Sequence, residues 1–382
     1  MKNKIIALLC AIILLAGCVP NNSEDEEVLQ NDEEGTEQQT FIVPSNQLSN
    51  ETYPIILPYE TSEARGVITN QMANRVDIDE MEQGLMRHSK EVFDPEKLYF
   101  QEGQYLTTDD LFSWIDGLNP ARLTEEEQED MDQEEKIDYY EENPRYLSHI
   151  LEQNYLKRKE KDNTVEVELE GMSIGIALKS VYRFQTETGG PYYYEDIPMK
   201  EMLEKGKEYA QTLVTNIREK EGLADIPIMV ALYREEDQNS PVPGNFVAKT
   251  TVNTGDVIGE WETINEEYIL FPSDEASKEY LDDYELVNSF GNEIAQFFPN
   301  YVGFIGEGFY IDKELQKLVI DIPLEFYGKT EVTGFTQYTY GLVQDMFSNY
   351  YDLEINVTSS NGAESLIFRN AGDESPTIHI YD

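Results

Sequence analysis

Apolar and polar residues are distributed in three different ways along this chain. Lys2 and Lys4 precede a continuous apolar stretch, Ile5–Ala16, which is too short to span a bilayer as a permanent helix. The next segment, up to Thr40, is acidic and nearly free of aromatics, so it cannot bury enough apolar surface to fold. Mixed apolar and polar positions begin near Phe41. The pattern predicts a cleaved leader (1–17), an acidic tether (18–40) and a folded region (41–382).

The first part of the folded region, residues 41–160, has the pattern of a mainly helical segment. Between Glu60 and Lys97, apolar residues such as Met81 and Leu85 recur at the spacing of one helix face. Thr124–Glu142 is so rich in Glu, Asp and Gln that it is typical of a solvated helix or an insertion rather than a binding site.

Residues 161–240 have the pattern of an α/β lobe. β-Branched residues alternate over Val165–Arg183, and Thr186–Pro191 supplies turn chemistry before the next tyrosines, which predicts a β-hairpin. Met199–Ile217 carries apolar residues three and four positions apart, and Gly222 ends that helix. A strand over Ile226–Tyr233 completes a β-β-α-β unit.

Residues 241–382 repeat this order of elements without repeating the sequence. The predicted elements are strands at Tyr301–Ile311 and Leu318–Tyr327, a helix at Gly334–Tyr350, and strands at Leu353–Val357, Ser365–Arg369 and Thr377–Tyr381. The expected fold class is mixed, α+β or α/β, with a helical N-terminal region followed by two α/β lobes that contain mixed β-sheets.

The charge of the chain restricts its partners. It carries 28 basic and 76 acidic residues, a formal net charge of −48. Nucleic acid is excluded, because phosphate binding requires a basic face. The acidic runs do not match a calcium loop, and His88, His149 and His379 lack the paired spacing of a zinc site. We therefore expect no metal and no cofactor.

Two motifs of the folded region could belong to an active or binding site, but each is more simply explained as part of a strand or of sheet packing. Gly171-Met-Ser-Ile-Gly175 matches the string of serine hydrolases, but Ser173 is followed by residues that continue a strand, where a nucleophile elbow requires a helix. Tyr192–Tyr194 could form a platform for stacking a sugar, although aromatics beside a hairpin more often cover the sheet. The prediction is a non-enzymatic protein, with an envelope hydrolase that uses Ser173 as the weaker alternative.

The leader ends in a lipobox, formed by Leu15, Ala16, Gly17 and Cys18. In such a sequence the thiol of Cys18 accepts a diacylglycerol before the chain is cut between Gly17 and Cys18. The expected partners are the lipoprotein-processing enzymes and, through the lipid, the cell membrane, with the protein on its extracytoplasmic face. Cys10, the other cysteine, lies in the removed segment and leaves no thiol for a disulfide.

Several strings resemble the CamS family of Gram-positive lipoproteins, the precursors of sex pheromones of the cAM373 type. They include Ser62-Glu-Ala-Arg-Gly66, Tyr146-Leu-Ser-His-Ile-Leu-Glu152, Gly171-Met-Ser-Ile-Gly-Ile-Ala177, Tyr327-Gly-Lys-Thr-Glu331 and His379-Ile-Tyr381. The resemblance implies that the discarded leader yields the pheromone, here the heptapeptide Ala11-Ile12-Ile13-Leu14-Leu15-Ala16-Gly17. The folded body would have a non-catalytic envelope role. The alternative is a solute-binding lipoprotein that holds its ligand between the two lobes.

Overall fold

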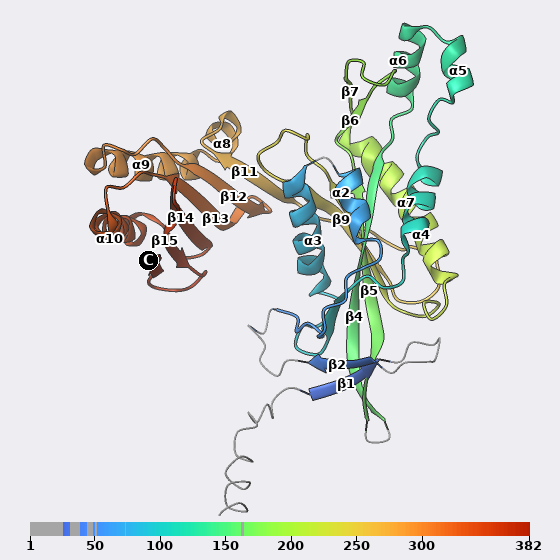
Figure 1. The fold of residues 1–382 in the computed structure, drawn as a ribbon, viewed down its shortest axis with the longest axis horizontal. Helices are drawn as coiled ribbons and strands as arrows, with labels where there is room; N and C mark the ends of the chain where they lie inside the picture. Colours follow the sequence, from blue (N-terminus) through green and yellow to red (C-terminus); the bar gives the residue numbers. More distant parts are fainter. Residues whose placement is uncertain (1–25, 31–38, 44–48, 50–51, 73, 162–163) are drawn as a thin grey trace, which may run out of the picture.

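The computed structural model describes residues 26–30, 39–43, 49, 52–72, 74–161 and 164–382. These residues form two lobes that lie side by side (Figure 1). The first lobe is built around an eight-stranded mixed sheet, and the second around a six-stranded mixed sheet. The mixed α/β fold class expected from the sequence is confirmed.

The helices and strands have the following bounds. The helices are α2 (Arg65–Gln71), α3 (Arg75–Ser89), α4 (Thr108–Leu118), α5 (Glu125–Asp130), α6 (Gln133–Glu142), α7 (Met199–Arg218), α8 (Asp274–Glu279), α9 (Leu281–Phe297) and α10 (Lys329–Met346). The first-lobe strands are β1 (Glu26–Gln30), β2 (Gln39–Val43), β3 (Tyr99–Glu102), β4 (Leu147–Lys161), β5 (Thr164–Leu178), β6 (Val181–Phe184), β7 (Tyr193–Asp196), β8 (Ile228–Arg234), β9 (Asn245–Val252) and β10 (Glu262–Thr263). The second-lobe strands are β11 (Glu266–Phe271), β12 (Ile305–Ile311), β13 (Glu314–Pro323), β14 (Asp352–Ser359), β15 (Gly362–Arg369) and β16 (Thr377–Ile380).

Strand β5 organises the first lobe. It pairs antiparallel with β4 on one side and parallel with β8 on the other, in a register that runs from Met172 opposite Ile228 to Leu178 opposite Arg234. The parallel pair requires a crossover, which β6, β7 and α7 supply. The hairpin predicted in this crossover is confirmed as β6–β7, and Gly189 adopts a left-handed φ of 81° in its turn.

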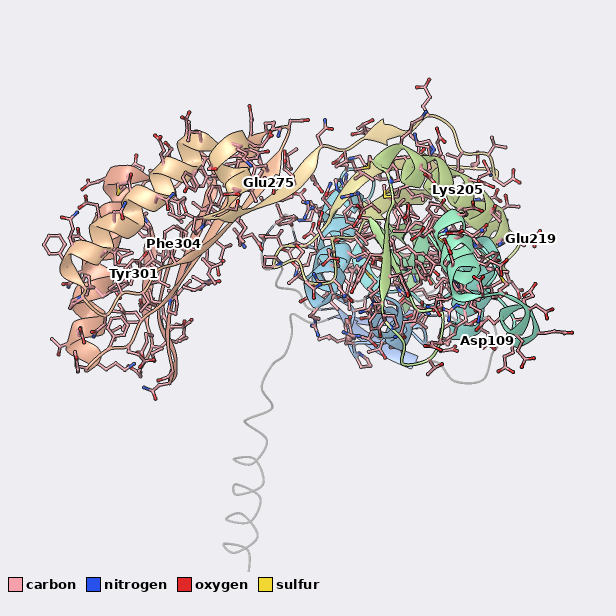
Figure 2. The ribbon with its side chains drawn as sticks, turned by 90° about the horizontal axis from the view of Figure 1, so that it is seen from above. Asp109, Lys205, Glu219, Glu275, Tyr301 and Phe304 are labelled. Carbon is pink, nitrogen blue, oxygen red and sulfur yellow. The ribbon has the colours of Figure 1, made fainter. Side chains whose placement is uncertain are left out.

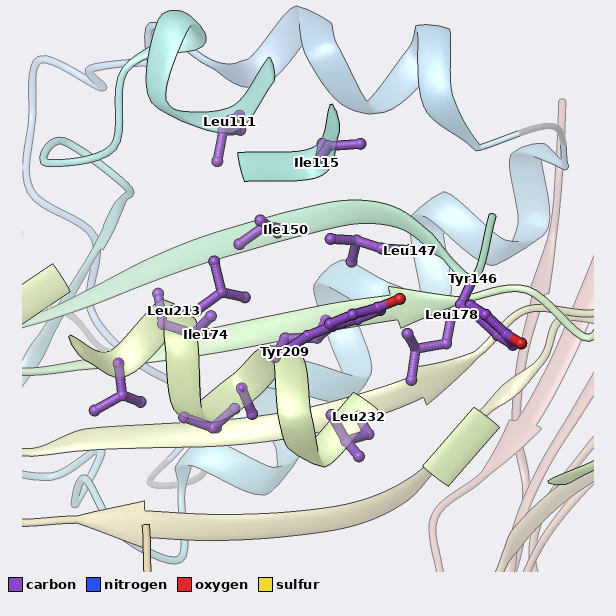
Figure 3. Close-up of a cluster of buried hydrophobic side chains, with 14 of the residues drawn as sticks. Leu111, Ile115, Tyr146, Leu147, Ile150, Ile174, Leu178, Tyr209, Leu213 and Leu232 are labelled. Carbon is purple, nitrogen blue, oxygen red and sulfur yellow. The ribbon is translucent and has the colours of Figure 1, made fainter. Parts of the chain in front are cut away.

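Helices cover both faces of this sheet, so alternate side chains along its strands enter two different cores. In β8, Ile228, Val230 and Leu232 face the core shared with α4 and α7, whereas Met229 and Ala231 face α3. Figure 3 shows the first of these cores, in which side chains of α4 and α7 meet those of β4, β5 and β8. Burial on both faces explains why β8 is a continuous apolar run.

In the second lobe, α9 and α10 pack their apolar faces on the six-stranded sheet, whose order is β11-β12-β13-β14-β15-β16. Strands β13 and β14 are parallel and are joined through α10, and the other neighbours are antiparallel. Val343 of α10 and Ile294 of α9 are fully buried in this core.

The lobes are joined by an ion cluster between α3 and β11. Arg87 Nη2 lies 2.7 Å from Glu80 Oε1 and 3.0 Å from Glu266 Oε2, and His88 Nε2 lies 3.2 Å from Glu266 Oε1. The Arg87 guanidinium also lies 4.6 Å from the ring centroid of Phe309 in β12. One arginine therefore contacts residues of both lobes.

The structure corrects several expectations. Residues 41–160 contain helices α2 to α6, as expected, and also β3 and the long β4 of the first sheet, which were not expected. The helix expected over Glu60–Lys97 is two helices, α2 and α3, that end at Ser89. The boundary expected at residue 241 assigned residues 245–263 to the second lobe, but their strands β9 and β10 extend the first sheet, since β9 pairs with β8. Part of the expected tether is strand β1, because backbone pairing with β2 and β5 does not depend on buried apolar side chains.

Candidate functional site

The lipobox and the heptapeptide lie outside the described residues. Leu15, Ala16, Gly17 and Cys18, together with Ala11, Ile12, Ile13 and Leu14, all precede Glu26, where the described chain begins. Within the described part of the chain, no helix has the length and apolar character to cross a membrane.

Ser173 lies in the middle of β5, as the sequence predicted, and its side chain is fully buried. Its Oγ is hydrogen-bonded to Ser89 Oγ at 2.7 Å, and Ser89 Oγ in turn donates to the carbonyl of Leu85. A nucleophile elbow would expose the hydroxyl at a strand-to-helix turn. The surroundings of Ser173 therefore do not fit a serine nucleophile.

The glycines on either side of Ser173 allow close packing against β5. A Cβ at Gly171 would lie 2.0 Å from Phe93 Cε1, and a Cβ at Gly175 would lie 3.1 Å from Met81 Cε. The Gly-x-Ser-x-Gly string is thus explained by α3 and the loop that follows it approaching this face of the sheet.

The three histidines lie in separate places. His88 faces Glu266 between the lobes, His149 is buried in β4, and His379 in β16 contacts the ring of Tyr381. Burial lowers the pKa of His149 to about 3 and keeps the ring neutral. In the ranges that the structure describes, no group of three or more His, Cys, Asp or Glu residues could hold a metal ion.

One cavity lies between α2, α3 and β4, with a volume of about 530 Å³. Its lining is mainly apolar and includes Ile55, Ile68, Met86, Phe100 and Ile150. Its buried polar residues are His149, Glu152 and Gln153. The Glu152 carboxylate accepts hydrogen bonds from the backbone amides of Gln104, Tyr105 and Leu106, so its structural task is to hold that loop.

The second cavity, about 550 Å³, lies at the carboxyl ends of β5 and β8 and is the candidate functional site. Lys179 directly follows β5, and Glu235 directly follows β8. The Glu235 amide donates to the carbonyl of Leu178 at 2.8 Å, which extends the pairing of the two strands. The parallel register therefore brings a lysine and a glutamate that are distant in sequence to the same edge of the sheet.

The remaining walls of this cavity come from aromatic and basic residues. The β6–β7 hairpin contributes Tyr182, Phe184, Tyr192 and Tyr194, and Tyr140 comes from α6. Arg122 and Arg145 lie between α4 and β4. Arg145 donates to Asp116 Oδ1 at 2.5 Å and to the carbonyl of Pro120 at 3.0 Å, so it fixes the loop that carries Arg122.

Burial perturbs both charged groups at the floor of the cavity. It raises the pKa of Glu235 to about 7, partly offset by the nearby charge of Lys179. It also lowers the pKa of Lys179, an effect opposed by Glu235 and reinforced by Arg145 and Arg122. Perturbed groups that converge in a cavity are typical of a ligand or reaction site.

Sequence reasoning missed Lys179 and Glu235. Each is a charged residue placed immediately after an apolar strand, and that position was the available signal. It was not usable without knowing that β5 and β8 are parallel neighbours. Of the residues noted from sequence, Tyr192 and Tyr194 do line this cavity.

Both cavities are lined by first-lobe residues, from Thr52 to Gln238. The solute-binding alternative placed a ligand between the two lobes. These cavities are instead formed within the first lobe, beside its sheet.

Comparisons with known proteins agree on one family. The model described as CamS sex pheromone cAM373 precursor matches residues 59–375. The crystal structure of the sex pheromone precursor from Lactobacillus salivarius subsp. salivarius UCC118 is 29% identical, with 88% of this chain and 98% of that chain covered and a TM-score of 0.78. The C-terminal domain of the sex pheromone staph-cAM373 precursor from Staphylococcus aureus is also 29% identical, with 82% and 99% covered and a TM-score of 0.67. The search of curated proteins found no match.

Proposed function

This chain belongs to the family of CamS sex pheromone cAM373 precursors, and we propose that it is a lipid-anchored extracytoplasmic protein whose leader is processed to a hydrophobic signalling peptide. The observation that carries the proposal is the placement of Cys18 directly after Leu15-Ala16-Gly17, at the end of the apolar stretch. Membership of this family supports the precursor role. The L. salivarius and S. aureus relatives are likewise described as sex pheromone precursors.

The proposed anchor is a lipid on Cys18. Each buried CH₂ of an acyl chain contributes about 0.8 kcal/mol, so the two or three chains of a lipoprotein hold it stably at the membrane. Cleavage before Cys18 leaves this residue as the new N-terminus and frees the leader.

The proposed signal is the heptapeptide Ala11–Gly17, which trimming of the freed leader would release. Its side chains are all apolar or absent, so its free termini are the polar groups by which a receptor pocket would orient it. In this proposal the folded body is not an enzyme. The burial of Ser173, which removes the one candidate nucleophile singled out from the sequence, supports that part.

The test compares two cysteine variants of the same leader. Cys18→Ala removes the lipidated thiol, whereas Cys10→Ala changes the other cysteine of the chain and lies outside the heptapeptide. Mass spectrometry of spent medium should detect Ala11–Gly17 from the parent and from Cys10→Ala, and lose it in Cys18→Ala. The membrane fraction should contain lipid-labelled protein in the same two strains.

The two halves of the proposal fail separately. If Cys18→Ala still incorporates labelled lipid, the anchor is assigned to the wrong residue. If the parent is lipidated while its medium contains no heptapeptide, the protein is an anchored lipoprotein and the signalling role is wrong.

A further inference from the structure

The proposed precursor role involves the leader and does not account for the cavity at the carboxyl ends of β5 and β8. In open α/β sheets, ligands bind beyond the carboxyl ends of parallel strands, where the loops diverge and leave a crevice. A volume of about 550 Å³ is within the range of small-molecule sites, about 300 to 1,000 Å³. The cavity therefore has the place and the size of a ligand site.

Its floor contains charged groups whose hydrogen bonds are incomplete. Glu235 is 6% exposed, and its Oε1 has no hydrogen-bond partner among the described residues. The Lys179 side chain is half-buried, and Glu235 is the opposite charge near it, with no ion pair within 4 Å between these two described residues. Leaving a buried polar group unsatisfied costs about 1 to 3 kcal/mol, more if it is charged. A ligand that offers an anion to Lys179 and a hydrogen-bond donor to Glu235 would complete both.

The lining of the cavity is less acidic than the surface of the protein. Asp109, Glu219 and Glu275 are examples of the exposed carboxylates distributed over both lobes (Figure 2). The cavity wall instead has as many basic as acidic residues, with Arg122, Arg145, Lys179 and Arg183 alongside Glu187, Glu235, Glu236 and Asp237. Arg145 is bonded to Asp116 and Arg183 lies over the ring of Tyr192, so the half-buried Lys179 and the exposed Arg122 are the cations that a ligand can meet.

The aromatic wall fits a ring that carries hydroxyl groups. Tyr192 and Tyr194 are each about half exposed at the rim, while Phe184 is buried behind them. The Arg183 guanidinium lies 4.3 Å from the ring centroid of Tyr192 and holds one of its faces. The C–H groups of a sugar ring carry partial positive charge and pack against the negative face of an aromatic ring.

We propose that this cavity binds a saccharide that carries a carboxylate, with the carboxylate between Lys179 and Arg122, a ring hydroxyl donating to Glu235, and the ring packed against the Tyr192 wall. N-acetylmuramic acid and hexuronic acids share this chemistry and come from different polymers, peptidoglycan and acidic glycans. Binding requires neither the lipid nor release of a peptide, so this proposal can be tested independently of the precursor role.

The test is a calorimetric titration of the full chain, purified in detergent, with N-acetylmuramic acid, glucuronic acid and N-acetylglucosamine. The two acidic sugars should bind at least tenfold more tightly than the neutral one. Whichever acidic sugar has the higher affinity identifies the source polymer, peptidoglycan or an acidic glycan. Lys179→Met and Arg122→Met should each lower the affinity about tenfold or more, because a charge-assisted contact is lost. Lys200→Met, at an 88% exposed side chain on α7, should leave it unchanged.

A loss of affinity in Arg122→Met would not be explained by misfolding, since Arg122 is exposed and its replacement should not disturb the core. The proposal is overturned if neither acid binds at millimolar concentration, or if both bind equally to the parent and to Arg122→Met. Tighter binding of free alanine or glycine than of any sugar would also overturn it, because the ligand would then be an amino acid.

Discussion

Replacing Gly171 by alanine tests whether the Gly-x-Ser-x-Gly string is there for packing. A Cβ at this position would lie 2.0 Å from Phe93 Cε1 and 2.6 Å from Phe93 Cζ, far inside van der Waals contact. The Phe93 ring cannot move aside easily, because it is stacked on Tyr155 at 4.7 Å between centroids. Its backbone is also held, since the Tyr53 hydroxyl donates to the Phe93 carbonyl at 2.5 Å.

We expect Gly171→Ala to lower the free energy of unfolding of the first lobe by about 3 kcal/mol, the upper end of the usual cost of overpacking. At about 2 to 4 °C per kcal/mol, the melting temperature should fall by about 6 to 12 °C. Thermal and urea unfolding followed by circular dichroism measures both. Gly66→Ala is the matched control, because Gly66 is exposed in α2 with nothing within 4 Å of a Cβ, and the change should stabilise by about 0.5 to 1 kcal/mol.

A double-mutant cycle identifies the obstacle. Phe93→Leu removes the ring atoms that a Cβ at Gly171 would meet, so Gly171→Ala should cost less in that background than in the parent. Equal costs in the two backgrounds would show that Phe93 is not the reason for glycine. A Gly171→Ala protein as stable as the parent would refute the packing explanation altogether.

Two further predictions concern buried charge. Arg87→Met leaves Glu80 and Glu266 without their shared partner and should destabilise the contact between the lobes by about 3 kcal/mol. Arg75→Met removes an exposed pair and should change the urea midpoint little, and equal effects of the two variants in urea unfolding would contradict this. His149 has a folded-state pKa of about 3, below its unfolded value, so its contribution to stability is lost as the pH falls from about 6.5 toward 3, about 3 kcal/mol by pH 4. His149→Leu should remove that loss. If the difference in stability between pH 7 and pH 4 is the same in the variant and the parent, His149 is not its cause.

The elements that could be predicted from sequence are those whose burial follows a simple period. Helix α7 buries Met202, Gly206, Ala210, Leu213 and Ile217 on one face, which is the 3.6-residue pattern seen in the sequence. Strand β8 is an apolar run because both of its faces are covered. In both cases local sequence and tertiary burial agree.

Strand β4 was missed because its buried positions are often polar. His149, Gln153 and Asn154 are all buried within it, so hydrophobicity does not alternate along its length. Their polar groups are served in part by distant residues, as when Gln153 Nε2 donates to the carbonyl of Glu82. A pattern that depends on such partners cannot be recognised from a local window.

The candidate site was missed for a related reason. Nothing near Lys179 in the sequence indicates Glu235, because their proximity comes from the parallel pairing of β5 with β8 across a long crossover. The boundary between the lobes depends on pairing in the same way, since β9 belongs to the first sheet only through its bonds to β8. Strand order is a tertiary property, and single-sequence patterns predict the strands without their neighbours.

The acidic exterior and a site for an anion are compatible because the two act over different distances. At physiological ionic strength the Debye length is about 8 Å, so exposed carboxylates farther away than that are largely screened from a ligand inside the cavity. Within the cavity, short distances give Lys179, Arg122 and the other lining charges more weight than carboxylates elsewhere on the surface. The net charge of −48 therefore governs which polymers can approach the whole protein, and the residues at the ends of β5 and β8 govern what the cavity can hold.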